Sequence, residues 1–139
     1  MKLRQATKKD FEGICELVQK LYGEKVLKKI DEDWRKDYLK LLKSIFIVEE
    51  NKKIIAYISI DINENSVYIA DLYVLPEYRR KGIATKLIKF VDEVRKNKNK
   101  RYLRVDVRTK DKPALRFYEK FGFIILESKD KKKSWRLIK

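Results

Sequence analysis

The chain has 139 residues, of which 36 are Lys or Arg and 21 are Asp or Glu, so the formal net charge at pH 7 is +15. It contains no His and a single Cys, Cys15, which excludes Ser-His-Asp and Cys-His catalysis, an internal disulfide, and metal sites built from imidazole or several thiolates. No apolar run approaches the roughly 20 residues of a membrane span. We therefore expect one folded domain over residues 1–139, cytoplasmic, with no membrane or metal partner.

The high positive charge would attract polyanions such as nucleic acid. Most basic residues are dispersed along the chain, and the densest run, residues 129–133, lies between two apolar runs and predicts a charged hairpin turn. The sequence has no recognised RNA-binding motif with stacking aromatic residues. We do not expect a nucleic-acid partner, and a basic nucleic-acid or ribosome-associated domain is kept as an alternative.

The first half of the chain predicts a short strand, two helices and three antiparallel strands. Thr7 followed by Asp10 is typical of a helix start, and apolar residues recur at helical spacing from Phe11 to Tyr22, with Gly23 as the stop. A second helix carries Trp34, Tyr38, Leu41 and Leu42 at the same spacing. The predicted strands are 3–6, 45–48, 54–60 and 67–74, and short polar turns between the last three favour a meander.

The pattern changes in the second half. A loop over 75–81 leads to a helix whose apolar residues run from Ile83 to Val94, and a strand follows over 102–107. Such a unit normally forms a right-handed parallel crossover. Pro113 suits the first turn of a short helix that ends at Gly122. Strands at 123–126 and 135–138 close the chain as a hairpin, so we expect a mixed α/β architecture around one sheet.

The residues at the beginning of the helix that starts near Ile83 predict an anion site. A helix N-terminus presents unpaired backbone N–H groups and a partial positive charge. Gly82 lets a ligand approach the backbone closely because it has no Cβ, and Arg79, Arg80 and Lys81 add full positive charges. The spacing matches neither the Walker loop nor the dinucleotide fingerprint. Together these features predict a cradle for a pyrophosphate.

The order Arg79-x-x-Gly82-x-Ala84 resembles the acetyl-CoA signature Gln/Arg-x-x-Gly-x-Gly/Ala of the GCN5-related N-acetyltransferase (GNAT) family. Residues 3–10 are similar to the opening strand and helix of that family, 71–74 to its central strand and 114–123 to its late motif. The resemblance covers nearly the whole chain. It implies a GNAT-like α/β domain, with a central mixed, mostly antiparallel sheet flanked by about four helices. It also implies transfer of an acetyl group from acetyl-CoA to a primary amine.

The resemblance also implies which residues contact acetyl-CoA. Backbone groups of the central strand would hold the pantetheine arm, N–H groups of the loop and helix start would hold the pyrophosphate, and a later loop would add contacts. The implied residues are Leu72, Tyr73, Val74, Arg79, Arg80, Lys81, Gly82, Ile83, Ala84, Thr85, Asp111 and Ala114. Asp111 stands where the family usually has Asn, and an ionised Asp cannot donate a hydrogen bond.

Tyr118 falls at the position of the family's common general acid, which protonates the departing thiolate. The general base is less specified: many relatives place Glu where this chain has Ala70, and Asp71 beside it is our candidate. Glu49, Glu50 and a water leading to solvent are the other candidates. Cys15 lies on the apolar stripe of the first helix, which predicts core packing rather than an acyl-enzyme.

The acceptor is expected near residues 24–38, as in relatives. Glu24, Asp31, Glu32 and Asp33 either attract a cationic amine there or form a solvated loop, and Trp34 and Tyr38 belong either to the core or to the acceptor wall. The acceptor is a small amine, a protein N-terminus or a lysine, and the family often forms homodimers. A CoA-binding module without turnover is a second alternative, motivated by Ala70 and Asp111.

Overall fold

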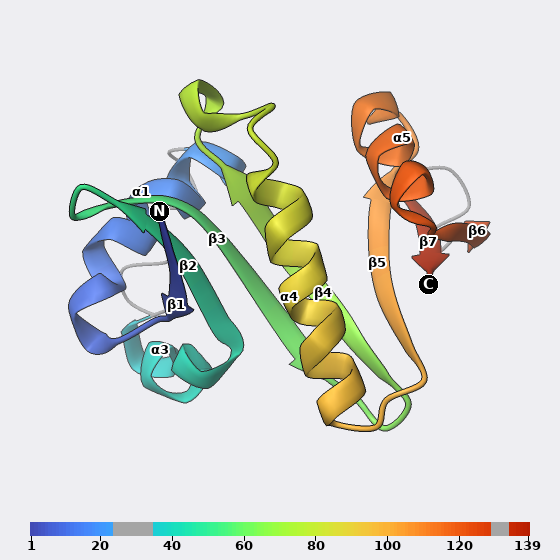
Figure 1. The fold of residues 1–139 in the computed structure, drawn as a ribbon, viewed down its shortest axis with the longest axis horizontal. Coiled ribbons are helices and arrows are strands. Elements are labelled where there is room, and N and C mark those ends of the chain that lie inside the picture. Colours follow the sequence, from blue (N-terminus) through green and yellow to red (C-terminus); the bar gives the residue numbers. More distant parts are fainter. Residues whose placement is uncertain (24–34, 129–133) are drawn as a thin grey trace. The chain divides into compact units, whose positions relative to one another are not determined.

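The structure, a computed structural model, describes residues 1–23, 35–128 and 134–139. The seven strands belong to one sheet in the order β1-β2-β3-β4-β5-β7-β6 (Figure 1). By their contacts the residues divide into two compact units, which are described separately. The first holds residues 1–60 and 71–87, and the second holds residues 61–70 and 88–139. A single domain over the whole chain stays a prediction.

The first unit contains the predicted opening strand, both early helices and the first hairpin. Its elements are β1 (Lys2–Gln5), α1 (Phe11–Tyr22), α3 (Arg35–Leu41), β2 (Ile45–Glu50) and most of β3 (Lys53–Ile62). β1 pairs antiparallel with β2, and β2 with β3. The chain turns between β2 and β3 at Asn51 and Lys52, both with positive φ, as a two-residue hairpin turn requires.

α1 forms because its apolar residues recur at helical spacing and can be buried together. Ile14, Cys15, Leu17 and Val18 are all buried, which confirms that Cys15 is a core residue. The helix ends where Gly23 adopts a φ of +94°, a conformation that favours glycine. The sequence therefore placed the end of this helix correctly; the predicted start at Thr7 begins a 3-10 turn, Lys8–Asp10, that leads into α1.

Tyr38 on α3 belongs to the core rather than to an acceptor wall. It is buried, its hydroxyl donates a 2.8 Å hydrogen bond to the Thr7 carbonyl, and its ring meets Phe11 edge-on with centroids 4.8 Å apart. Trp34 and the acidic residues of the predicted acceptor segment lie outside the described residues.

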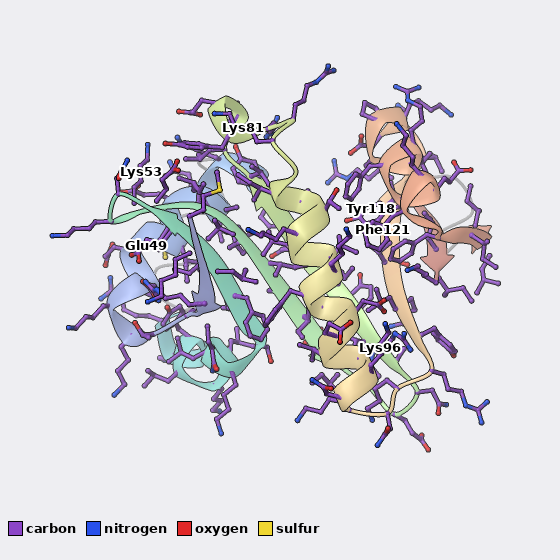
Figure 2. All side chains as sticks on the ribbon, in the orientation of Figure 1. Glu49, Lys53, Lys81, Lys96, Tyr118 and Phe121 are labelled. Atoms are coloured by element: carbon purple, nitrogen blue, oxygen red, sulfur yellow. The ribbon has the colours of Figure 1, made fainter. Side chains whose placement is uncertain are left out.

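An ion-pair network ties the beginning of α1 to β1 and β2. Arg4 donates to both carboxylate oxygens of Asp10, each at 2.8 Å, and to Glu49 at 3.2 Å. Asp10 also accepts from the Thr7 N–H at 2.7 Å, so the pairing of Thr7 with Asp10 at a helix start is confirmed, and a partly buried ion pair reinforces it. Glu49, near the end of β2 (Figure 2), is thereby paired with Arg4.

The second unit contains the parallel crossover and the closing hairpin. Its elements are part of β4 (Ser66–Val74), most of α4 (Ile83–Asn97), β5 (Tyr102–Arg108), α5 (Lys112–Phe121), β6 (Ile124–Ser128) and β7 (Ser134–Ile138). β4 pairs parallel with β5 from Ser66↔Tyr102 to Ile69↔Val105. β7 pairs antiparallel with both β5 and β6, so the last strand inserts beside β5 and leaves β6 at the edge. The lysine-rich turn between them lies outside the described residues.

Within the part of the chain that the structure describes, no helix combines the length and the apolar character that crossing a bilayer requires.

We predict that Asp10→Asn lowers the free energy of unfolding by about 2 kcal/mol at pH 7, because a hydrogen-bonded charge partner of Arg4 is lost. Arg4 holds the pKa of Asp10 below its usual range. The stabilisation is therefore complete above the unfolded-state pKa of about 4 and declines as pH falls through the lower folded-state pKa. Urea denaturation of both proteins between pH 7 and pH 2 measures it; a difference that does not shrink in acid would contradict the assignment.

Candidate functional site

The chain leaves β4 through a short loop that is anchored to the neighbouring strand. The Leu75 N–H donates to the Ile55 carbonyl at 2.9 Å, and both Val74 and Leu75 are buried. A single 3-10 turn, η4 (Pro76–Tyr78), follows, with the Tyr78 N–H donating back to the Leu75 carbonyl at 2.9 Å. The loop therefore starts from a fixed point at the end of β4.

The Arg79 side chain links this loop back to the end of β4. Its Nε donates a 2.8 Å hydrogen bond to the Val74 carbonyl, and its guanidinium carbon lies 5.4 Å from the centre of the Tyr73 ring. A cation over an aromatic face is stabilised by the ring quadrupole. The sequence predicted that Arg79 contacts a ligand. In the structure, the Arg79 side chain also links the loop to Val74 and Tyr73 at the end of β4.

Gly82 carries the turn into α4. Its φ is +80° and that of Arg80 is +62°, and a Cβ built at position 82 would meet no atom within 4 Å. Glycine is thus favoured by the backbone conformation, while the space above it is open. Lys81, in the same loop (Figure 2), places its Nζ 5.4 Å from the centre of the Tyr78 ring.

The first backbone N–H groups of α4 are oriented as an anion site requires. Helical hydrogen bonding begins with the Lys86 N–H, which donates to the Gly82 carbonyl at 3.0 Å. The N–H groups of Ile83, Ala84 and Thr85 come before it and have no intrahelical acceptor. Together with the positive end of the helix dipole and the nearby cations, they can hold a phosphate group.

Asp71 lies just before the residues expected to meet the pantetheine arm. Like Leu72 and Tyr73, it is half-buried, whereas Ala70 before it is exposed. The hydroxyl of Tyr22, the last residue of α1, donates a hydrogen bond to Asp71 Oδ1. Sequence reasoning missed Tyr22, which reads as the end of the apolar stripe of α1. Nothing in the sequence links it to a residue 49 positions away.

Tyr57 on β3 is a second residue that sequence reasoning missed. Its side chain is 1% exposed, and its hydroxyl makes no well-formed hydrogen bond with the described residues. Burial, and secondarily the negative charge of Asp71, raise the pKa of Tyr57. Tyr57 is therefore a neutral phenol beside a carboxylate.

In the second unit, Asp111 and Ala114 form the beginning of α5. The Asp111 carboxylate caps the helix by accepting from the Ala114 N–H at 3.1 Å, which is the usual role of an acid at this position. Asp111 therefore has a structural function of its own, and its contact with a coenzyme stays a prediction.

Tyr118 on α5 (Figure 2) is 6% exposed and packs edge-on against Phe117 and Phe123, with ring centroids 5.1 and 5.2 Å apart. Burial, and secondarily the charge of Asp111, raise the pKa of Tyr118. The phenol is therefore protonated throughout the neutral range, which is the state that a general acid needs.

The structure brings the sequence-predicted residues together in two groups. Residues 71–74 and 79–85 belong to the first unit, whereas Asp111, Ala114 and Tyr118 belong to the second. Among the described residues, no group of three or more carboxylate or thiol side chains is placed to hold a metal ion.

Comparison with known proteins finds similarity to acetyltransferases. The sequence model of the Acetyltransferase (GNAT) family matches residues 11–123. A protein named as an uncharacterised N-acetyltransferase of Methanocaldococcus jannaschii is 30% identical over 99% of this chain and 66% of its own length. The thialysine N-epsilon-acetyltransferase of Mus musculus is 44% identical over 41% of this chain and 34% of its own length. The chain thus spans less than two thirds of the length of these two relatives.

Among solved structures, the paiA N-acetyltransferase of Thermoplasma acidophilum in complex with coenzyme A superposes with a TM-score of 0.78. The match covers 97% of this chain and 96% of that one, at 20% sequence identity. This likeness confirms the fold predicted from the sequence.

We predict that Gly82→Glu abolishes CoA binding, because a carboxylate would project into the open space beside the first N–H groups of α4. Gly82→Ala is the matched control: it carries the same positive-φ strain, about 1 kcal/mol, but adds only a methyl group where no atom lies within 4 Å. Isothermal titration calorimetry with CoA should detect binding for the Ala variant and none for the Glu variant. Equal affinities would remove the cradle from this loop.

Proposed function

Because the chain belongs to the GNAT family of acetyltransferases, we propose that it transfers the acetyl group of acetyl-CoA to a primary amine by direct attack in a ternary complex. The observation that carries this proposal is the entry into α4. It combines three N–H groups without intrahelical acceptors, open space over Gly82, and a hydrogen bond from Arg79 to Val74 that links the loop to β4. These donors are proposed to hold the diphosphate of the coenzyme. The backbone of residues 72–74, which belongs to the same unit, is proposed to hold the pantetheine arm.

The reaction requires three proton or charge adjustments. The acceptor ammonium gives up a proton and becomes a neutral amine, whose nitrogen attacks the thioester carbon. The C–S bond then breaks, the second proton leaves the nitrogen for water, and the thiolate takes a proton from the general acid, which regains one from water. We assign the acid to Tyr118 on the resemblance and on its chemistry. We assign the base to Asp71 on its chemistry alone, because the family's base position is Ala70 and Asp71 is the carboxylate beside it; general acid–base help contributes about 10²–10⁴-fold.

No acyl-enzyme step is proposed. Cys15 is buried in the core of α1, and the sequence has no His to activate a nucleophile. Positioning of two substrates side by side supplies much of the rate enhancement in a direct transfer. The proposed mechanism therefore asks the chain to bind, orient and exchange protons.

We expect Tyr118→Phe to lower kcat by about 100-fold, since the thiolate would lose its proton donor, while CoA affinity stays the same. Tyr102→Phe on β5 is the control, because it removes a half-buried phenol that has no proposed role. Thiol release measures turnover and calorimetry measures affinity. Full activity of the Tyr118→Phe enzyme would take Tyr118 out of the mechanism.

The raised pKa of Tyr118 also predicts the alkaline pH dependence. A general acid fails when it loses its proton, and an ordinary tyrosine does so near pH 10. Because burial raises the pKa of Tyr118, kcat/KM for acetyl-CoA should show no decline from this residue up to about pH 10. A descending limb below pH 9 that Tyr118→Phe removes would contradict this assignment.

The acceptor class is decided by an amine panel. Thialysine, the substrate in the name of the mouse relative, stands for small amines with a terminal ammonium group. Peptides with a free N-terminus and peptides with one lysine stand for protein acceptors. Acetyl transfer to any of them supports an enzyme, whereas CoA binding without thiol release on the whole panel would indicate a binding module.

We also propose a cytoplasmic location, because a lone buried cysteine suits a reducing compartment. A homodimer stays a prediction that sedimentation of the purified chain can test.

A further inference from the structure

The contact between Tyr22 and Asp71 links the end of α1 to β4, the strand before the loop that leads into α4. The Tyr22 hydroxyl donates to Asp71 Oδ1, although the two residues are 49 positions apart. Gly23, with its φ of +94°, ends α1 directly after Tyr22. Tyr22 is therefore the last residue of α1, and its side chain reaches the Asp71 carboxylate from the end of the helix.

The surroundings of Asp71 are phenolic. Tyr22 faces it from α1, Tyr57 faces it from β3, and Tyr73 lies two residues further along β4, on the same side of the strand. Tyr57 is a neutral phenol whose pKa is raised by burial and by the charge of Asp71. Of these three phenols, Tyr22 donates the hydrogen bond that joins a second element, α1, to the carboxylate.

A donated hydrogen bond affects a carboxylate in two ways that matter for proton transfer. It favours the ionised form, which can accept a proton, and it restricts rotation about the bond to the carboxyl group. A base within hydrogen-bond reach of its proton must have both properties. Asp71 is only half-buried, so a proton that it accepts can pass on to solvent.

We propose that Tyr22 is a positioning residue for acetyl transfer: its hydroxyl orients the Asp71 carboxylate to take the proton from the acceptor ammonium group. This inference rests on the proposed function. In the step, one N–H bond of the ammonium breaks and an O–H bond forms on Asp71, leaving a neutral amine. Asp71 then releases the proton to water, and Tyr22 keeps its own proton throughout.

The test is Tyr22→Phe, assayed with acetyl-CoA and the best amine of the panel from pH 5 to pH 10. We expect kcat/KM for the amine at neutral pH to fall roughly 10-fold, the effect of one hydrogen bond to a charged group. We also expect the acid limb of the profile to move to higher pH, with the Kd for CoA unchanged. The carboxyl ¹³C titration of Asp71 in the cofactor-free protein should move in the same direction.

Two further variants separate positioning from folding. Tyr68→Phe removes a bond of the same kind, from Tyr68 to Asp106 at 3.1 Å in the second unit, and should leave the acid limb in place. In an Asp71→Asn background, Tyr22→Phe should have little further effect on kcat/KM, because its target is gone.

Each outcome bears on one proposal or both. A wild-type protein that acetylates no amine overturns the proposed function and the positioning role together. A wild-type protein that turns over, with an acid limb and an Asp71 titration that Tyr22→Phe leaves unmoved, overturns the positioning role alone. Equal losses from Tyr22→Phe in the wild-type and Asp71→Asn backgrounds would also overturn it.

Discussion

The turn from β4 into α4 leaves several backbone N–H groups without intrahelical acceptors, and two features decide where those groups lie. The Leu75–Ile55 hydrogen bond and the Arg79–Val74 hydrogen bond hold the beginning of the loop. Gly82 then adopts a positive φ, so that the chain can enter the helix with open space above the turn. An anion site at a helix N-terminus needs free N–H groups and an open approach. The first turn of α4 provides the N–H groups, and the space over Gly82 is open.

The polar contacts of α1 show how a helix is held at both ends. At its beginning, Asp10 is paired with Arg4 of β1; at its end, Tyr22 is bonded to Asp71 of β4. Between them the buried face of the helix is apolar. Burial of the apolar face sets which side of the helix points inward, and the two polar contacts join its ends to β1 and β4.

Burial of phenols is a common feature of the residues assigned to proton transfer or lying beside them. Tyr57 and Tyr118 are both nearly inaccessible to solvent, and burial is the main cause of their raised pKa. A buried phenol stays neutral, because the charged form is penalised in an apolar environment. The proposed mechanism uses this difference: a buried phenol keeps its proton, while a half-buried carboxylate on β4 is proposed to accept one.

The helices, the strands and the loop that leads into α4 were predictable from the sequence because their determinants are local. Apolar spacing marked α1 and α4, Gly23 and Gly122 marked helix ends, and residues 79–84 carried the motif that led to the family. The insertion of β7 beside β5, the engagement of Glu49 by Arg4 and the capping role of Asp111 needed the structure. So did the pairing of Tyr22 with Asp71, since a hydrogen bond between residues 49 positions apart depends on how α1 packs on the strands. Local periodicity reports which face of an element is apolar; it carries no information about which polar side chains meet once those faces are buried.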